Sequence, residues 1–188
     1  ERTYQRRVAP DRIISPELAR HLAGISREIG RQVGVLVNRR GQIEDVFVGD
    51  AHRIYLPDIG RTRAGQSTLR GLRHIHTVFG KDGLHRDDFA DLTKLRLDLV
   101  VALETRDDGQ PGKLTTAHIN PNAHKAKRTI DHVTSEDYRS IYEVEVDFKE
   151  LVEEIERELG RQTKARKADG GQTRAVLVGV YDRKQTAQ

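Results

Sequence analysis

Residues 71–98 constrain the fold of this chain more than any other stretch. Their first part belongs to the segment 69–78, where the apolar Leu72 and Ile75 are interspersed with polar histidines, and this segment is expected to form a β-strand. In an extended chain, side chains two positions apart point to the same face, so His74 and His76 are expected to lie side by side. The strand therefore presents a pair of histidines to one face of the sheet that it joins.

A polar turn and a helix are predicted to follow this strand. The sequence Gly-Lys-Asp-Gly at 80–83 is typical of a turn. A helix is expected to begin near Asp87, because Phe89, Leu92 and Leu95 recur at a spacing that lines one helical face. Asp87 and Asp88 would lie in the first turn, where carboxylates favour the positive end of the helix dipole. The unit is a strand with two histidines, a turn, and an acidic helix start.

The rest of the chain alternates between predicted helices and strands. Helices are expected at 16–29, after the cap Ser15 and before Gly30, and at 148–159, after the cap Asp147 and before Gly160. Strands are expected at 33–38, 43–49, 54–56, 97–104, 114–119 and 142–147, whereas 121–136 reads as irregular. This order predicts an α/β (α+β) fold with a mixed sheet of five or six strands flanked by helices.

The same pattern suggests a division of the chain into four parts. Residues 1–14 show no periodicity and are expected to form an N-terminal arm, and 15–160 form the α/β domain. Residues 161–173 have the charged, glycine-ended composition of a linker. The apolar run at 175–180 then predicts a buried strand, so 174–188 are interpreted as the first strand of a further domain.

Composition narrows the classes of protein to which the chain can belong. Charged residues make up 33% and hydrophobic residues 36% of the 188 residues. No apolar run approaches the length of a membrane span. The first fifteen residues lack the apolar core of a signal peptide, and Cys is absent, which agrees with a cytoplasmic location. The sequence contains neither G-x-x-x-x-G-K-[ST] nor G-x-S-x-G, so P-loop and serine-nucleophile chemistry are excluded for these residues.

The sharpest chemical candidate is a metal site at His74, His76 and Asp88. A catalytic zinc ion takes three protein ligands of the histidine and carboxylate type plus a water molecule. Two histidines on one strand face and an aspartate on the next helix could supply them, with Glu28 or Glu44 as general base. The alternative interpretation is a pair of ordinary strand histidines beside a helix-start carboxylate.

Several basic groups could contact phosphates of a nucleic acid. The net charge is +4, so nucleic acid is a permitted partner, but 29 acidic residues offset the 33 basic ones and most are expected to be ordinary surface. No aromatic-rich strand accompanies these groups, so sequence-specific binding of single-stranded RNA has no support. The candidates are Arg61 and Arg63, Arg39 and Arg40, Lys125, Lys127 and Arg128, and the charged residues of 161–167.

Four segments resemble the N-terminal extension of long-form HflX GTPases. They are EIGRQVGVLV at 28–37, LPDIGR at 56–61, LRGLRHIHT at 69–77 and LRLD at 95–98. The closing RAVLVGV at 174–180 is similar to the strand that opens the common HflX N-terminal domain. The resemblance implies a parent protein that binds and hydrolyses GTP with Mg²⁺ and associates with the large ribosomal subunit. Its GTPase motifs would lie beyond residue 188, so no GTP-binding residue is expected in this chain.

The histidine unit also resembles the JAB/JAMM metalloprotease fold, whose signature is H-x-H followed by S-x-x-D. As this pattern runs in extended HflX proteins, it implies the register His76-Thr77-Val78, with His85 at the serine position and Asp88 at the aspartate. Val78 then stands in place of the second histidine, and His85 is a candidate replacement ligand. Shifting the pattern to His74 and His76 restores two histidines but displaces them by about 6 to 7 Å along the strand.

Three functions are compatible with these observations. The first is a non-catalytic accessory domain of an HflX-type GTP-binding protein, which contacts the large ribosomal subunit through its basic residues. The second is a JAB-type zinc hydrolase that cleaves a peptide or isopeptide bond, using the candidate metal site, and the third is a purely structural domain that shields or positions the GTPase. No membrane partner and no resident cofactor other than this zinc ion are expected.

Overall fold

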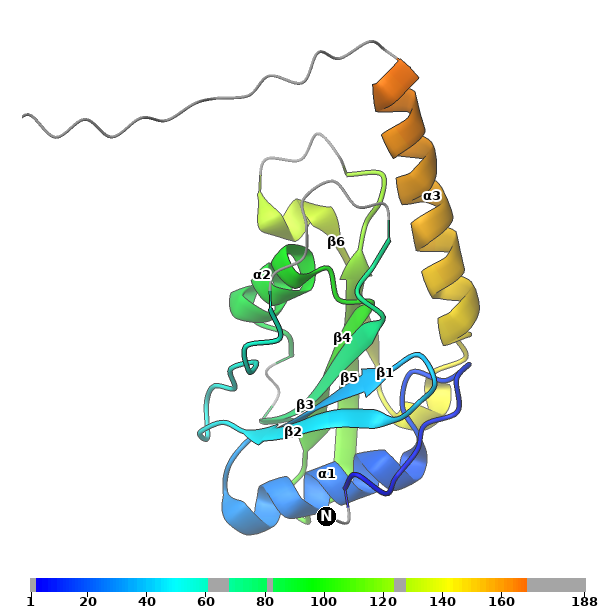
Figure 1. The fold of residues 1–188 in the computed structure, drawn as a ribbon. Helices are drawn as coiled ribbons and strands as arrows, with labels where there is room; N and C mark the ends of the chain where they lie inside the picture. Colours follow the sequence, from blue (N-terminus) through cyan, green and yellow to red (C-terminus); the bar gives the residue numbers. More distant parts are fainter. Residues whose placement is uncertain (1–2, 61–67, 81–82, 124–127, 169–188) are drawn as a thin grey trace, which may run out of the picture.

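A six-stranded mixed sheet forms the centre of the molecule, as the computed structural model shows (Figure 1). The structure describes residues 3–60, 68–80, 83–123 and 128–168. The elements along the chain are α1 (Pro16–Ile29), β1 (Val33–Asn38), β2 (Ile43–Val48), β3 (Leu72–Phe79), α2 (Arg86–Leu95), β4 (Leu99–Thr105), β5 (Pro111–Ile119), η1 (Thr129–His132), β6 (Val133–Tyr138), η2 (Ile141–Glu143) and α3 (Phe148–Ala168). The predicted class, α/β with a mixed sheet flanked by helices, is confirmed.

Strand order in the sheet is β2-β1-β3-β4-β5-β6. Only β3 and β4 run parallel, and α2 makes the crossover between them, whereas every other neighbouring pair of described strands is antiparallel. A parallel pair requires such a crossover, which is why the strand, turn and helix at 71–98 determine the arrangement. The predicted hairpin of β1 and β2 is also present.

Successive side chains of β3 point to opposite faces of the sheet, and different helices pack on the two faces. Thr77 donates a hydrogen bond from its hydroxyl to Ser26 of α1 at 2.8 Å, and the guanidinium of Arg73 lies 4.3 Å from the ring centre of Phe148 in α3. His76, on the opposite face, approaches α2. Helices α1 and α3 therefore cover one face of the sheet and α2 covers the other (Figure 1).

Helix α1 forms as its sequence predicts. The hydroxyl of Ser15 accepts a hydrogen bond from the N–H of Leu18, and Pro16 occupies the first turn. Gly30 ends the helix in the left-handed conformation that glycine adopts most easily. Leu18 and Leu22 are fully buried against the sheet.

The N-terminal residues from Thr3 onward pack against the sheet, although the sequence suggested an arm without fixed structure. Val8, Ile13 and Ile14 are buried in the hydrophobic core. The N–H of Val8 donates to the carbonyl of Gly41 at 3.0 Å. Gly41 has a φ of 78°. A Cβ at this position would overlap the carbonyl oxygen of Val8, so only glycine allows the approach.

Three local predictions are wrong. Helix α3 does not end at Gly160 but continues to Ala168, because Gly160 is tolerated inside an otherwise strongly helical sequence. The strand predicted at 142–147 is a short 3₁₀ turn followed by extended chain, and 54–56 form no regular element. Conversely, β6 begins inside the segment that was expected to be irregular, 121–136, and continues to Tyr138. The first residues of the predicted linker, 161–168, thus belong to α3, whereas the rest of the linker and the further strand at 174–180 stay predictions, since 169–188 lie outside the described residues.

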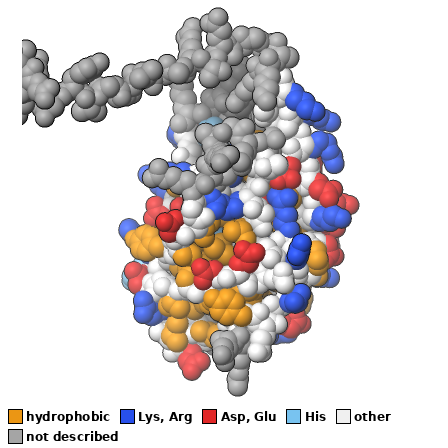
Figure 2. Space-filling view, in the orientation of Figure 1, with side chains coloured by type: hydrophobic (Ala, Val, Ile, Leu, Met, Phe, Trp, Pro, Cys, Tyr) orange, Lys and Arg blue, Asp and Glu red, His pale blue; other side chains and the backbone are white. Residues whose placement is uncertain are grey.

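Apolar and charged side chains occupy different parts of the surface. Figure 2 shows apolar side chains gathered on the lower part of one face and intermixed basic and acidic side chains along its right-hand border. Val48 and Ile29 are large apolar residues that are nearly half exposed. None of the described helices combines the length and the apolar character that crossing a lipid bilayer requires.

Candidate functional site

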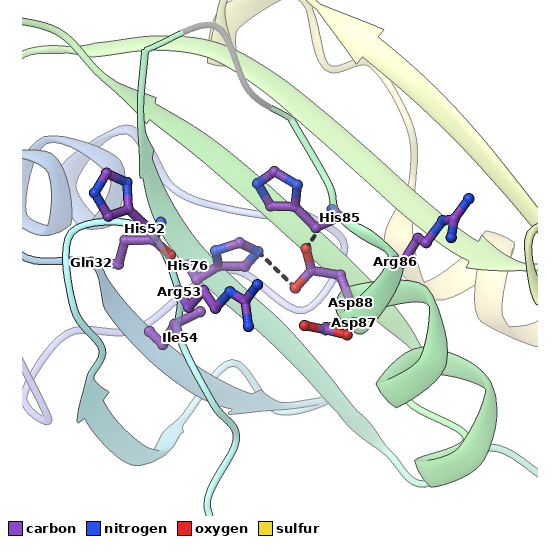
Figure 3. A pocket seen from close by; sticks show the side chains of 9 residues that line it. All are labelled: Gln32, His52, Arg53, Ile54, His76, His85, Arg86, Asp87 and Asp88. Carbon is purple, nitrogen blue, oxygen red and sulfur yellow. Dashed lines mark hydrogen bonds and ion pairs between the residues drawn. The ribbon is translucent and has the colours of Figure 1, made fainter.

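The histidine unit lines a pocket at the carboxyl end of β3, next to the start of α2. Ligands commonly bind at this edge of α/β sheets, where parallel strands end and a crossover helix begins. The pocket has a volume of about 400 Å³. It is lined by Gln32, His52, Arg53, Ile54, His76, His85, Arg86, Asp87 and Asp88 (Figure 3).

His76 and Asp88 form the buried centre of the pocket. Nε2 of His76 lies 3.3 Å from Oδ1 of Asp88, and the N–H of His85 donates to Oδ2 of the same carboxylate at 2.8 Å. Burial raises the pKa of Asp88, but the contacts with His76 and with the N–H of His85 outweigh it and lower that pKa below its ordinary value. Asp88 therefore holds a negative charge that fixes the position of the His76 ring.

His74 lies behind His76 and is cut off from water. The two rings stack with centres 4.9 Å apart, and Phe47 packs on the other side of His74 at 5.3 Å. Among the described residues, neither ring nitrogen of His74 has a hydrogen-bond partner. Burial, followed by the neighbouring His76, lowers the pKa of His74 well below its ordinary value, so this ring is neutral.

Glycine at position 34 lets the residues around this histidine stack pack closely. A Cβ on Gly34 would lie 2.6 Å from Cε2 of Phe47 and 2.8 Å from Cδ1 of Ile54. In β1, Gly34 pairs with His76 on one side and with Phe47 on the other. The missing side chain therefore leaves room for Phe47 and Ile54 beside the stacked histidines.

The structure brings together some of the predicted metal ligands and separates others. His74 and His76 share a face, as predicted, and His76 meets Asp88, with His85 in the same pocket. His74 does not line the pocket. Glu28 and Glu44, the candidate bases, do not line it either; Glu28 is exposed on α1, and Glu44 is exposed on β2, where it accepts a hydrogen bond from Asn38 at 2.9 Å.

Three residues of the pocket, Gln32, His52 and Arg53, were not identified from the sequence. Gln32 is buried at the start of β1, whereas His52 and Arg53 are exposed in the turn after β2. The backbone of that turn is fixed by Asp50, whose carboxylate accepts the N–H groups of His52 and Arg53. No local pattern marks these residues, because only the pairing of β1 with β3 brings them to His76.

The predicted zinc ligands are not gathered around one point in the described residues. In the part of the chain that the structure describes, no three His, Asp or Glu side chains are placed to hold one metal ion. In the register that places His76 against Asp88, the next residue on that face is Val78, which is apolar and buried.

Four of the predicted phosphate contacts lie outside the described residues, namely Arg61, Arg63, Lys125 and Lys127. Arg128 is described and exposed, but its guanidinium pairs with Asp131 at 2.8 Å. Its charge is thus compensated locally, and an external phosphate would compete with Asp131.

The pocket contains the buried carboxylate of Asp88, which can accept hydrogen bonds, and the ring of His76, which Asp88 holds in position. Such an arrangement is suited to binding a polar group, and it resembles an acid–base pair without the nucleophile or base that catalysis would also need. A scan against models of protein families, a search of curated proteins and a search of solved structures each returned no match.

Proposed function

We propose that this chain is the N-terminal accessory domain of an HflX-type GTP-binding protein that associates with the large ribosomal subunit in the cytoplasm. Its own role is binding rather than catalysis. GTP and Mg²⁺ belong to another part of the parent protein, since the chain has no sequence for cradling nucleotide phosphates.

The observation that carries this proposal is the convergence of the resembling segments on Arg70. Its guanidinium donates to the carbonyls of Ile59 at 2.6 Å, Gly60 at 2.8 Å and Leu95 at 2.9 Å. These carbonyls belong to the segments at 56–61 and 95–98, and Arg70 belongs to the segment at 69–77. The fourth segment, at 28–37, includes β1, which pairs with β3.

This convergence supports the proposal because the resembling segments, although other residues separate them in the sequence, contact one another in the fold. Backbone carbonyls need hydrogen-bond partners, and a single arginine with five N–H groups can satisfy several of them. The four segments therefore belong to one structural unit of this chain.

The gene that encodes the chain provides the first test. We expect its reading frame to continue beyond residue 188 into a domain with G-x-x-x-x-G-K-[ST], and the full-length protein to bind GTP in the presence of Mg²⁺. A stop codon after this segment, or a following domain without that motif, would contradict the proposal.

A second candidate function, a JAB-type zinc hydrolase, is favoured by one observation. The distance of 3.3 Å between His76 and Asp88 agrees with the register that the JAB/JAMM resemblance implies, and His85 lies in the same pocket. His76, Asp88 and His85 would hold the zinc ion, which would activate a water molecule. Holding it would require His85 to move toward the pair, because no three ligands are placed for it in the described residues.

Elemental analysis separates the two candidates. The accessory-domain proposal predicts less than about 0.1 zinc per chain after incubation with a slight excess of zinc. The hydrolase predicts stoichiometric zinc that Asp88→Ala removes. Asp87→Ala is the matched control, since Asp87 lines the same pocket but does not contact His76.

A further inference from the structure

A second pocket lies on the other face of the sheet, where α3 begins. It has a volume of about 400 Å³ and lies between the N-terminal segment, the β1–β2 turn and the first two turns of α3. Its walls combine three apolar side chains with three basic ones and a single acidic one. The residues are Pro10, Phe148 and Val152, then Arg39, Arg40 and Lys149, and Glu153.

The basic side chains of this pocket differ in how far they are already paired. Arg39 is fully engaged, because it donates to Asp98 at 2.6 Å and to Glu156 at 2.8 Å. Arg40 is exposed, and its guanidinium has no ion-pair partner within the described residues. Lys149 is exposed and lies 4.0 Å from Glu153, a distance at which a surface pair contributes little. Arg40 and Lys149 are therefore free to bind an anion.

A buried cation lies directly beneath the apolar wall. Arg73 has no exposed surface, and its guanidinium carbon lies 4.3 Å from the ring centre of Phe148. None of its three guanidinium nitrogens has a hydrogen-bond partner in the described part of the chain. Burying a charge without a partner is costly, and a nearby negative charge reduces that cost.

Two cations at or beneath the pocket lack an acidic partner. Arg39 pairs with Asp98 and Glu156, and Lys149 lies 4.0 Å from Glu153, whereas Arg40 and Arg73 form no ion pair within the described residues. Because the walls beside the free cations are apolar, the anion that fits best carries an apolar body.

We propose that this pocket binds a carboxylate attached to an apolar group, with the carboxylate at Arg40 and Lys149 and the apolar group against the exposed Pro10, beside the buried Phe148 and Val152. Such a ligand is either a free organic acid or an acidic side chain next to an apolar residue of a partner peptide. A nucleic acid fits less well, because bases stack on exposed aromatic rings, whereas Phe148 is buried. The proposal is independent of the GTPase assignment.

Titration of the ¹⁵N-labelled chain with three small probes tests the chemistry. The probes are 3-phenylpropionate, its neutral amide 3-phenylpropanamide, and acetate, and the readout is the amide signals of Arg40 and Lys149. We expect saturable shifts with 3-phenylpropionate and affinities at least about tenfold weaker for the other two. Equal binding of the amide would show that charge plays no part, and equal binding of acetate would show that the apolar walls play none. Either result, or no saturable shift, overturns the proposal.

Matched variants locate the site and distinguish the two sources of ligand. Arg40→Gln and Lys149→Gln are each expected to weaken 3-phenylpropionate binding about threefold to tenfold. Arg106→Gln, which removes the same charge from the exposed β4–β5 turn, should leave it unchanged. A peptide Ac-Glu-Phe-NH₂ that binds more tightly than 3-phenylpropionate would identify a partner protein as the source, and weaker binding of this peptide would identify a free acid. Unchanged binding in both pocket variants, or displacement of the probe by a short RNA that binds more tightly, would overturn the site.

Discussion

His74 shows how a single side chain can link the pocket to stability. It is buried, its ring stacks on that of His76, and the ring of Phe47 lies tilted against it. Its pKa lies well below the ordinary value because burial opposes its charge. In the unfolded chain, the same ring takes up a proton near about pH 6.5. Folding therefore competes with protonation of this residue as the pH falls.

The stability of the protein is expected to decrease below about pH 6.5 through His74. The unfolded state binds one more proton than the folded state in this range, so the free energy of unfolding falls by up to about 1.4 kcal/mol per pH unit. His74→Phe keeps a ring in the stack but removes the titration, so its stability should fall less steeply. Urea unfolding at about pH 7.5 and about pH 5.5 measures both slopes, and parallel slopes would show that His74 does not cause the effect.

A second prediction at this scale concerns Gly34. A methyl group there would collide with Phe47 and Ile54. Gly34→Ala should therefore destabilise the protein by about 1–3 kcal/mol and shift the ring signals of His74 and His76. Gly24→Ala is the control, since Gly24 lies inside α1 and a Cβ added there would have no neighbouring atom within 4 Å. That substitution should be neutral or stabilise by up to about 1 kcal/mol, because alanine favours a helix. Equal destabilisation in the two variants would argue against the proposed crowding.

At the scale of elements, the sequence predicted best where a local pattern is strong. Ser15, Pro16 and Gly30 determine the ends of α1, and the two-residue period correctly places His74 and His76 on one face. The sequence could not show that Asp88 meets His76, because that depends on how α2 packs on the sheet. It also missed β6, a polar edge strand that forms by pairing with β5. The buried N-terminal segment was missed as well, because its position depends on the close approach of Val8 to Gly41.

The attachment of α3 depends on an ion-pair network that no sequence pattern indicated. Arg39, from the β1–β2 turn, bridges Asp98 at the start of β4 and Glu156 in the middle of α3. Glu156 also accepts the N–H of Leu69, and Asp98 that of Gly71. The side chain of Asp98 is completely buried, so its charge depends on Arg39.

Arg39→Met is expected to destabilise the protein by at least about 2 kcal/mol, because Asp98 would remain buried without its cation. Adding Asp98→Asn should recover part of this loss, since the double variant no longer buries a charge. Arg128→Met, which breaks the exposed pair with Asp131, should cost less than about 1 kcal/mol and serves as the control. Chemical unfolding measures the free energy of unfolding of all three variants. Strictly additive losses in the double variant would contradict the coupling of Arg39 with Asp98.

At the scale of the whole molecule, the proposed role is binding to a large ribonucleoprotein. A net charge of +4 favours such a partner, but basic and acidic side chains are intermixed on the face that Figure 2 shows. Binding to ribosomal RNA would therefore depend on local groups of cations rather than on one broad basic surface. Contacts between cations and phosphates weaken steeply with salt, because binding releases counterions.

Sedimentation of the 188-residue chain with purified ribosomal subunits tests whether it contacts the large subunit. We expect the chain to sediment with large subunits at about 50 mM salt, not with small ones, and a rise to about 300 mM to release most of it. A chain that stayed in the supernatant at both salt concentrations, or sedimented equally with either subunit, would contradict the assignment to a domain that contacts the large ribosomal subunit.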